Sequence, residues 1–220
     1  ITTAEMTIAL MLACWRRIPM VDRRVTSGEW HKATYRHDSY ELYGKTIGIV
    51  GAGRIGRLVM ERLQGWGVNI IYFDPYPMDP VLEEKYHAKR VDLDTLCREA
   101  DAIALNCPLT DTTRGMINME KLKLMKPTAI IVNEARGAVI NLDDLAEALE
   151  KGIIWGAAID VWEPEPCDPN SPLLKMEKVI TTSHLGASTR ESLIRVYSEV
   201  LANTARLFKD GRPENVQNGL

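Results

Sequence analysis

The chain has 220 residues, of which 45% are hydrophobic and 26% charged, and its formal net charge is −3. That length is enough for one large domain or two small ones with a proper core. The slightly acidic balance provides no basic patch for phosphates, which argues against nucleic acid as a partner. The most apolar stretch, TIALMLACW, is too short to span a bilayer and ends at two arginines. We therefore expect a globular protein that binds neither nucleic acid nor a membrane.

The four cysteines and four histidines lack the spacing of a metal site or of a disulfide framework. No CxxC pair occurs among Cys14, Cys97, Cys107 and Cys167, and a chain of this size does not need disulfides. We expect reduced thiols, a cytoplasmic location and no metal. The chain begins ITTAEM, without Met and without the charged region of a signal peptide, and we expect it to be the interior of a longer protein.

The first predicted element is a helix over Thr2 to Arg17, a stretch that contains neither Gly nor Pro. Apolar residues occur on nearly every side of it, so it has to be covered all round, by its own domain or by a partner subunit. We expect Pro19 to end this helix. Val21 to Tyr43 is expected to form a mixed, aromatic-containing arm, because it shows no clear periodicity.

From Lys45 onward, short apolar runs alternate with helical segments. The runs are typical of buried parallel strands: TIGIV (46–50), VNIIYF (68–73), AIALN (102–106), TAIIVN (128–133), IWGAAID (154–160) and VITTS (179–183). The clearest helix is Leu142 to Glu150, with Asn141 as its N-cap, and a long helix over Arg190 to Lys209 closes the chain. This alternation predicts an α/β fold, a doubly wound parallel sheet with flanking N- and C-terminal helices.

The first apolar run leads directly into GAGRIG, which has the GxGxxG spacing. Gly51 permits a tight turn, Gly53 leaves room for a pyrophosphate, and Gly56 lets the next helix pack close to the strand. The N-terminus of that helix offers N–H groups and a partial positive charge to phosphates. The following strand ends at Asp74, 18 residues after Gly56, where an acid binds ribose hydroxyls. This context predicts a Rossmann dinucleotide-binding domain rather than a plain structural turn.

Asp74 also indicates which dinucleotide is bound. Its carboxylate would repel a 2′-phosphate, and no Arg or Lys follows it closely in FDPYPMDP. The sequence therefore favours NAD over NADP. The alternative is that Asp74 only forms a turn before Pro75.

Three charged side chains follow predicted strands, which is where open α/β sheets bind ligands. Taken singly, Arg136, Glu165 and His184 each have an ordinary explanation as an exposed or structural residue. Together they supply what reduction of a carbonyl by hydride requires. A histidine gives the proton, a carboxylate orients the imidazole and favours its charged form, and an arginine binds a substrate carboxylate and polarises the carbonyl. We predict that these three residues are the catalytic set.

Five motifs occur in a characteristic order: YGKTIGIVGAGRIG, LNCPLTDTTRGMIN, VNEARGAVIN, GAAIDVWEPEP and SHLGAST. In them the chain resembles the D-isomer-specific 2-hydroxyacid dehydrogenases, nearly end to end, and HLGAST is most similar to their phosphoglycerate dehydrogenase-like branch. The resemblance implies hydride transfer between NAD and C2 of a D-2-hydroxy acid or 2-oxo acid, with catalytic Arg136, Glu165 and His184. It also implies a set of cofactor contacts, which includes the glycines of the loop: Gly51, Gly53, Arg54, Ile55, Gly56, Asp74, Cys107, Pro108, Thr113, Glu134, Ala135, Arg136, Asp160, His184, Leu185, Gly186 and Ala187.

Three positions depart from the family pattern. Ser183 stands where Pro is common before the histidine, which is expected to loosen that loop. Asn106 stands where His is frequent, with no obvious catalytic cost. Glu134 stands where a small or neutral residue is more usual. Because a charge facing the nicotinamide would be unfavourable, we expect the Glu134 side chain to point away from it.

The resemblance also implies a domain organisation. Residues 1–43 would be the N-terminal helix and arm, 44–188 the core of the NAD-binding domain and 189–210 the return helix, while the substrate domain is absent from this chain. Because that domain closes over the nicotinamide and positions the substrate, we expect this piece alone to bind NAD(H) but to turn over slowly or not at all. Family dimers use the N-terminal helix and arm, so a homodimer is expected.

Other functions share these motifs. Transcriptional corepressors of the same fold keep the Arg–Glu–His set and use dinucleotide binding to control assembly, but the chain shows no nuclear localisation run and no long regulatory tail. Phosphonate dehydrogenase is similar in the cofactor domain, and RLQGWG (62–67) resembles it. Formate dehydrogenase is less favoured, because the Glu–His pair suits reversible proton transfer to a ketone.

Overall fold

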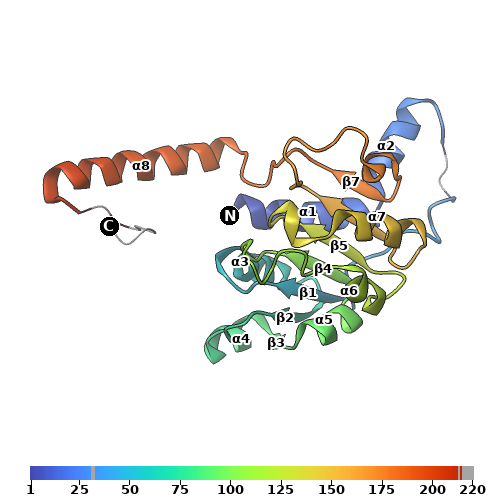
Figure 1. The fold of residues 1–220 in the computed structure, drawn as a ribbon, viewed down its shortest axis with the longest axis horizontal. Helices are drawn as coiled ribbons and strands as arrows, with labels where there is room; N and C mark the ends of the chain where they lie inside the picture. Colours follow the sequence, from blue (N-terminus) through green and yellow to red (C-terminus); the bar gives the residue numbers. More distant parts are fainter. Residues whose placement is uncertain (31–32, 213, 215–220) are drawn as a thin grey trace.

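The computed structural model describes residues 1–30, 33–212 and 214, in which seven parallel strands form one sheet of order β3-β2-β1-β4-β5-β6-β7 (Figure 1). The strands are β1 (Thr46–Val50), β2 (Asn69–Phe73), β3 (Ala88–Arg90), β4 (Ala102–Leu105), β5 (Ile130–Asn133), β6 (Gly156–Ile159) and β7 (Val179–Thr181). The chain builds outward from β1 through β2 to β3, then crosses back to β4 on the other side of β1. The predicted doubly wound parallel sheet is confirmed.

Helices cover both faces of this sheet. The described helices are α1 (Thr2–Trp15), α2 (Ile18–Thr26), α3 (Arg54–Leu63), α4 (Pro80–Tyr86), α5 (Leu93–Glu99), α6 (Met119–Leu124), α7 (Leu142–Glu150) and α8 (Arg190–Asp210), with short 3₁₀ turns η1 (Gly137–Val139) and η2 (Pro172–Lys175). Of these, α8 covers neither face. Along β5, Ile130 and Val132 pack into a core with α1, α3 and α4, whereas Ile131 packs with α5, α6 and α7. The central strands β1, β4, β5 and β6 lack polar alternation because both of their faces are buried.

Helix α1 is covered within its own domain. Met11 and Trp15 are almost fully buried, and the helix contacts α3 as well as β5, β6 and β7. Its apolar residues on nearly every side are therefore explained by cover from its own domain, which is the first of the two possibilities given above, the other being cover by a partner subunit.

The prediction for residues 16 to 43 was wrong in part. Helix α1 ends at Trp15 rather than Arg17, and α2 occupies the start of the predicted arm. Pro19 lies in the first turn of α2, where a proline is favourable because the N–H groups of that turn have no partner inside the helix. It therefore begins a second helix instead of only ending the first. The short elements α4, α5, α6 and β3 were also not predicted, since none is longer than seven residues and periodicity is weak over such lengths.

The two helices predicted over residues 142–150 and 190–209 are confirmed. In α7 the Asn141 side chain accepts hydrogen bonds from the N–H groups of Asp143 and Asp144, at 3.1 and 3.2 Å. Helix α8 ends at Gly211, which has a φ of 66°, and extends away from the sheet (Figure 1). Its exposed apolar residues are Leu193, Ile194, Val196, Tyr197, Val200, Leu201, Leu207 and Phe208. Among the described helices, none has the length and apolarity needed to cross a membrane.

Candidate active site

The glycine loop joins β1 to α3, and its glycines have different roles. A Cβ on Gly51, whose φ is +95°, would lie 2.8 Å from backbone atoms of Asn106 and Cys107. A Cβ on Gly56 would lie 2.0 Å from the carbonyl oxygen of Gly51. Both glycines are therefore required by close packing. A Cβ on Gly53 would meet nothing within 4 Å, so open space lies at the N-terminus of α3, as binding of a pyrophosphate requires.

Asp74 follows β2 and lies directly beside this loop. Its Oδ2 accepts a hydrogen bond from the N–H of Ala52 at 2.8 Å, and its Oδ1 accepts one from the N–H of Tyr76 at 2.9 Å. Each carboxylate oxygen can accept a further bond. Asp74 therefore holds the glycine loop and still has acceptor capacity for ribose hydroxyls.

The segment after β4 forms a turn close to the glycine loop. The Thr113 hydroxyl donates to the carbonyl of Pro108 at 2.7 Å and accepts from the N–H of Thr110 at 2.8 Å. Burial raises the pKa of the Cys107 thiol to about 11. The raised pKa favours the protonated thiol, and contact of Cys107 with the cofactor stays a prediction.

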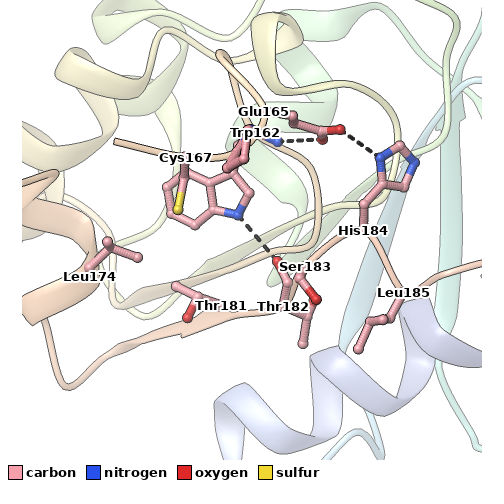
Figure 2. A pocket seen from close by; sticks show the side chains of 10 residues that line it. Trp162, Glu165, Cys167, Leu174, Thr181, Thr182, Ser183, His184 and Leu185 are labelled. Carbon is pink, nitrogen blue, oxygen red and sulfur yellow. Dashed lines mark hydrogen bonds and ion pairs between the residues drawn. The ribbon is translucent and has the colours of Figure 1, made fainter. Parts of the chain in front are cut away.

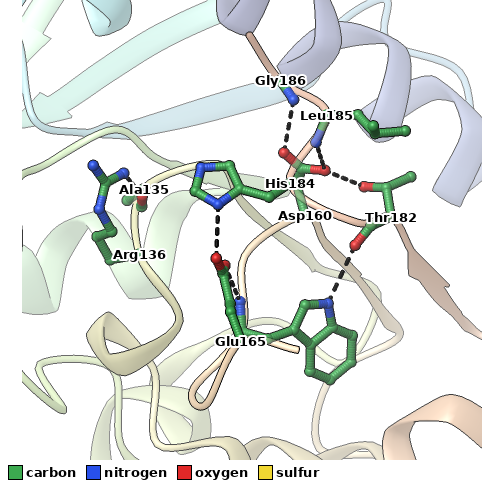
Figure 3. A network of polar contacts seen from close by, with 9 residues as sticks. Ala135, Arg136, Asp160, Glu165, Thr182, His184, Leu185 and Gly186 are labelled. Atoms are coloured by element: carbon green, nitrogen blue, oxygen red, sulfur yellow. Dashed lines mark hydrogen bonds and ion pairs between the residues drawn. The ribbon is translucent and has the colours of Figure 1, made fainter. Parts of the chain in front are cut away.

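His184 and Glu165 form a pair at the carboxyl edge of the sheet (Figure 3). The Nδ1 of His184 lies 2.9 Å from Oε2 of Glu165, while Oε1 of the same carboxylate accepts the N–H of Trp162 at 3.0 Å. The hydrogen bond with His184 lowers the pKa of Glu165, and the Trp162 N–H and the charge of Arg136 act in the same direction. An ionised carboxylate fixed on both oxygens thus holds the imidazole.

The loop that carries His184 is held by a single residue, Asp160, which is 1% exposed. Its carbonyl accepts the His184 N–H at 2.7 Å, and its carboxylate accepts the N–H groups of Leu185 and Gly186 at 2.7 and 2.8 Å. The Thr182 hydroxyl donates to the same carboxylate at 2.5 Å. His184 has a φ of 60°, a left-handed conformation that is uncommon for a non-glycine residue and persists only where its surroundings enforce it. The imidazole is therefore placed by a loop whose backbone is hydrogen-bonded to Asp160.

Arg136 enters the same site from the end of β5 (Figure 3). Its guanidinium donates to the carbonyl of Ala135 at 2.7 Å, and its side chain is exposed. The buried Asn133 holds this turn, since its Oδ1 accepts the Ala135 N–H and its Nδ2 donates to the Arg136 carbonyl, both at 3.0 Å. Sequence reasoning missed Asn133, although a polar residue closing the apolar run IIVN was a usable signal. It also missed Thr182, for which no local signal existed.

Glu134 lies beneath the His184 loop. Its side chain is 6% exposed, and neither carboxyl oxygen has a hydrogen-bond partner among the described residues. A Cβ on Gly186 would lie 2.2 Å from Oε2 of Glu134 and 3.2 Å from Oδ2 of Asp160, so the two carboxyl groups are neighbours. Burial, and secondarily the charge of Asp160, raises the pKa of Glu134 to about 8. Burial thus favours the neutral form of the Glu134 carboxyl, and its orientation relative to a nicotinamide stays a prediction.

A cavity of about 620 Å³ adjoins the His184–Glu165 pair (Figure 2). It is lined by Trp162, Glu165, Pro166, Cys167, Leu174, Thr181, Thr182, Ser183, His184 and Leu185. The indole N–H of Trp162 donates to the Thr182 carbonyl at 3.2 Å, which fixes the ring as one wall. The cavity therefore brings apolar surface up to an ionisable pair, as is typical of small-molecule sites.

The family follows from a match over most of the chain. Residues 8–186 match the model described as D-isomer specific 2-hydroxyacid dehydrogenase, NAD binding domain. The chain belongs to this family. NAD is accordingly the cofactor of the domain, in agreement with the open space at Gly53 and the acceptor oxygens of Asp74.

The relatives of this dehydrogenase domain have names that refer to different substrates. The chain is 43% identical to the D-3-phosphoglycerate dehydrogenase of Methanocaldococcus jannaschii, over 99% of this chain and 41% of that protein. It is 42% identical to the glyoxylate reductase of Thermococcus litoralis, over 98% of this chain and 66% of that one. The D-isomer specific 2-hydroxyacid dehydrogenase of Lactobacillus delbrueckii ssp. bulgaricus, solved with NAD, superposes with a TM-score of 0.88 at 29% identity, covering 99% of this chain and 69% of that one. The chain thus spans 41% to 66% of the length of these two curated relatives.

We expect Gly53→Val to weaken NADH binding by about tenfold or more while the thermal midpoint changes little. The φ of Gly53, −72°, lies outside the left-handed region that favours glycine, and the new side chain would fill the space for the pyrophosphate. Gly56→Ala is the matched contrast and should lower the midpoint, because its methyl group meets backbone. Calorimetric titration and thermal denaturation measure the two effects. Unchanged NADH affinity in Gly53→Val would show that the pyrophosphate binds elsewhere.

Proposed function

We propose that the protein transfers a hydride between NAD and C2 of a D-2-hydroxy acid or the corresponding 2-oxo acid. The observation that carries this proposal is the pair formed by His184 and Glu165, 2.9 Å apart at the same sheet edge as the glycine loop. NAD supplies or accepts the hydride when bound. The residues of this chain have two further tasks, to bind the substrate carboxylate and to move a proton.

Each catalytic role is inferred from the atoms that face the site. Glu165 holds Nδ1 of His184, which leaves Nε2 to give a proton to the carbonyl oxygen during reduction and to take it back during oxidation. The negative charge of Glu165 stabilises the imidazolium. Arg136, with its planar guanidinium, binds the substrate carboxylate and polarises the carbonyl.

The substrate domain and the dimer are part of the same proposal. The exposed apolar residues of α8 are those that a substrate domain would cover in the complete protein, with residues 1–43, 44–188 and 189–210 as the three parts of the cofactor domain. A homodimer would use α2 and the rest of the arm, where Ile18, Val25 and Trp30 are exposed. Helix α1 itself contributes little apolar surface, because its own domain buries it.

The activity is tested by offering 2-oxo acids with NADH to the protein expressed from its full reading frame. We expect NADH oxidation with at least one of them, glyoxylate being the first to try. With a 2-oxo acid that carries a side chain on C2, the product should be the D-hydroxy acid, whereas the glycolate formed from glyoxylate is achiral. Absence of turnover with every 2-oxo acid, in a protein that still binds NADH, would overturn the proposal and favour a dinucleotide-sensing scaffold.

Glu165→Gln is expected to move the pH profile of 2-oxo acid reduction to lower pH. Reduction requires a protonated imidazole, and a neutral glutamine does not stabilise the imidazolium as the carboxylate does. The alkaline limb of kcat/KM against pH should therefore begin to fall earlier than in the wild type. Glu163→Gln, at a nearby exposed position, is the matched control. Superimposable profiles for Glu165→Gln and the wild type would remove Glu165 from this role.

A further inference from the structure

A cation lies beside the ribose-binding carboxylate, although it is 16 residues away in the sequence. Arg90 ends β3, which pairs in parallel with β2 so that Tyr72 and Arg90 are register partners. The Nε and Nη2 atoms of Arg90 donate to the carbonyl of Asp74 at 3.2 and 3.0 Å, and Nη2 also donates to the carbonyl of Pro75 at 2.9 Å. Its guanidinium therefore lies at the turn where the adenosine ribose binds.

Arg90 can still bind a ligand. Its side chain is exposed, and its contacts in the described part of the chain are two backbone carbonyls rather than a carboxylate. Its positive charge is therefore not neutralised by an ion pair there. The Nη1 atom makes none of these bonds, so a guanidinium edge remains for an anion.

Asp74 and Arg90 have opposite effects on a phosphate at the ribose 2′ position. A carboxylate repels it, whereas a guanidinium binds phosphate oxygens through charge-assisted hydrogen bonds. The sequence after Asp74 contains no nearby Arg or Lys, but the sheet brings one in from the neighbouring strand. Discrimination against NADP at this turn therefore depends on the carboxylate of Asp74.

We propose that Arg90 is a phosphate-binding residue of the cofactor site that the charge of Asp74 masks, and that its guanidinium binds the 2′-phosphate of NADP(H) once this charge is removed. In the wild type, Asp74 keeps the site selective for NAD(H). The inference concerns only the adenosine half of the cofactor, so it does not depend on the substrate or on the catalytic residues.

Calorimetric titration of the 220-residue chain with NADH and NADPH tests the proposal. Asp74→Ser should bind NADPH at least about tenfold more tightly than the wild type. The double variant Asp74→Ser/Arg90→Gln should lose this gain in NADPH affinity, because the hydrogen bond between the guanidinium and the phosphate is lost. NADH affinity should differ by less than about threefold between these two variants, since NADH has no 2′-phosphate. Asp74→Asn is measured in parallel, because it removes the charge and keeps the side-chain size.

Lys89→Gln in the Asp74→Ser background is the matched control. Lys89 is the exposed neighbour of Arg90 and carries the same charge, but successive residues of a strand point to opposite faces. The NADPH gain should survive this change. Equal NADPH affinity with and without Arg90 would overturn the proposal. An equal loss of NADH and NADPH affinity on Arg90→Gln would also overturn it, because it would mean that Arg90 only supports the turn. Loss of the gain on Lys89→Gln would overturn it too, in favour of a general charge effect.

Discussion

His184→Asn is expected to lower kcat for 2-oxo acid reduction by the complete protein by roughly 10²–10⁴-fold, the usual contribution of a general acid. Asparagine is the sharper substitution than alanine here, because His184 has a φ of 60° and Asn tolerates the left-handed region. The three N–H bonds from the loop to Asp160 can therefore persist, and the loss reports the missing proton donor rather than a collapsed loop.

His87→Asn is the matched control for this substitution. His87 is exposed, has a φ of 47° and ends α4, away from the sheet edge that carries the proposed catalytic set. We expect its kcat to equal that of the wild type. Steady-state rates at saturating NADH and 2-oxo acid decide the matter, and a loss below tenfold in His184→Asn would remove His184 from the acid–base role.

Glu134→Gln is expected to make the stability of the domain less dependent on pH between about 5 and 8. In the folded chain the pKa of Glu134 is raised to about 8, above its value in the unfolded chain, so the folded state binds the extra proton in this interval. The contribution of Glu134 to the free energy of unfolding should therefore be greatest at acidic pH and decrease as pH rises toward 8, by up to roughly 1.4 kcal/mol per pH unit. A glutamine cannot ionise, so that contribution disappears.

Urea denaturation at pH 5, 6, 7 and 8 measures this effect as the difference between the wild type and Glu134→Gln. The variant should gain stability relative to the wild type as pH increases. Glu84→Gln, at an exposed position on α4, shows what removal of an ordinary surface carboxylate does. Parallel pH dependence in the wild type and Glu134→Gln would mean that the pocket beneath Gly186 accommodates the ionised carboxylate.

Features governed by local rules could be predicted from the sequence. The Asn141 cap and the span of α7 follow from hydrogen bonds within three residues. The glycine loop was equally predictable, because a left-handed φ at Gly51 and close packing at Gly56 admit little else. The apolar runs indicated the central strands, since strands covered on both faces need apolar residues at every position.

Contacts between distant segments could not be predicted in this way. The position of Arg90 beside Asp74 depends on the pairing of β3 with β2, and β3 is too short to show a pattern. The same is true of Thr182 and Asp160, which meet across β6 and β7. Glu134 shows the limit most clearly, because its burial and its raised pKa come from Gly186 and Asp160 on two other loops.

The sequence by itself determined the dinucleotide-binding fold, the choice of NAD and the identity of the three candidate catalytic residues, because glycines at fixed spacing and charges after apolar strands have few physical uses. Only the tertiary structure decided how those charges are held: Glu165 against His184, the His184 loop on Asp160, and Arg90 next to Asp74. Hydrogen bonds and desolvation depend on distances across the sheet edge, and those distances are set by strand order and register rather than by any local stretch of residues.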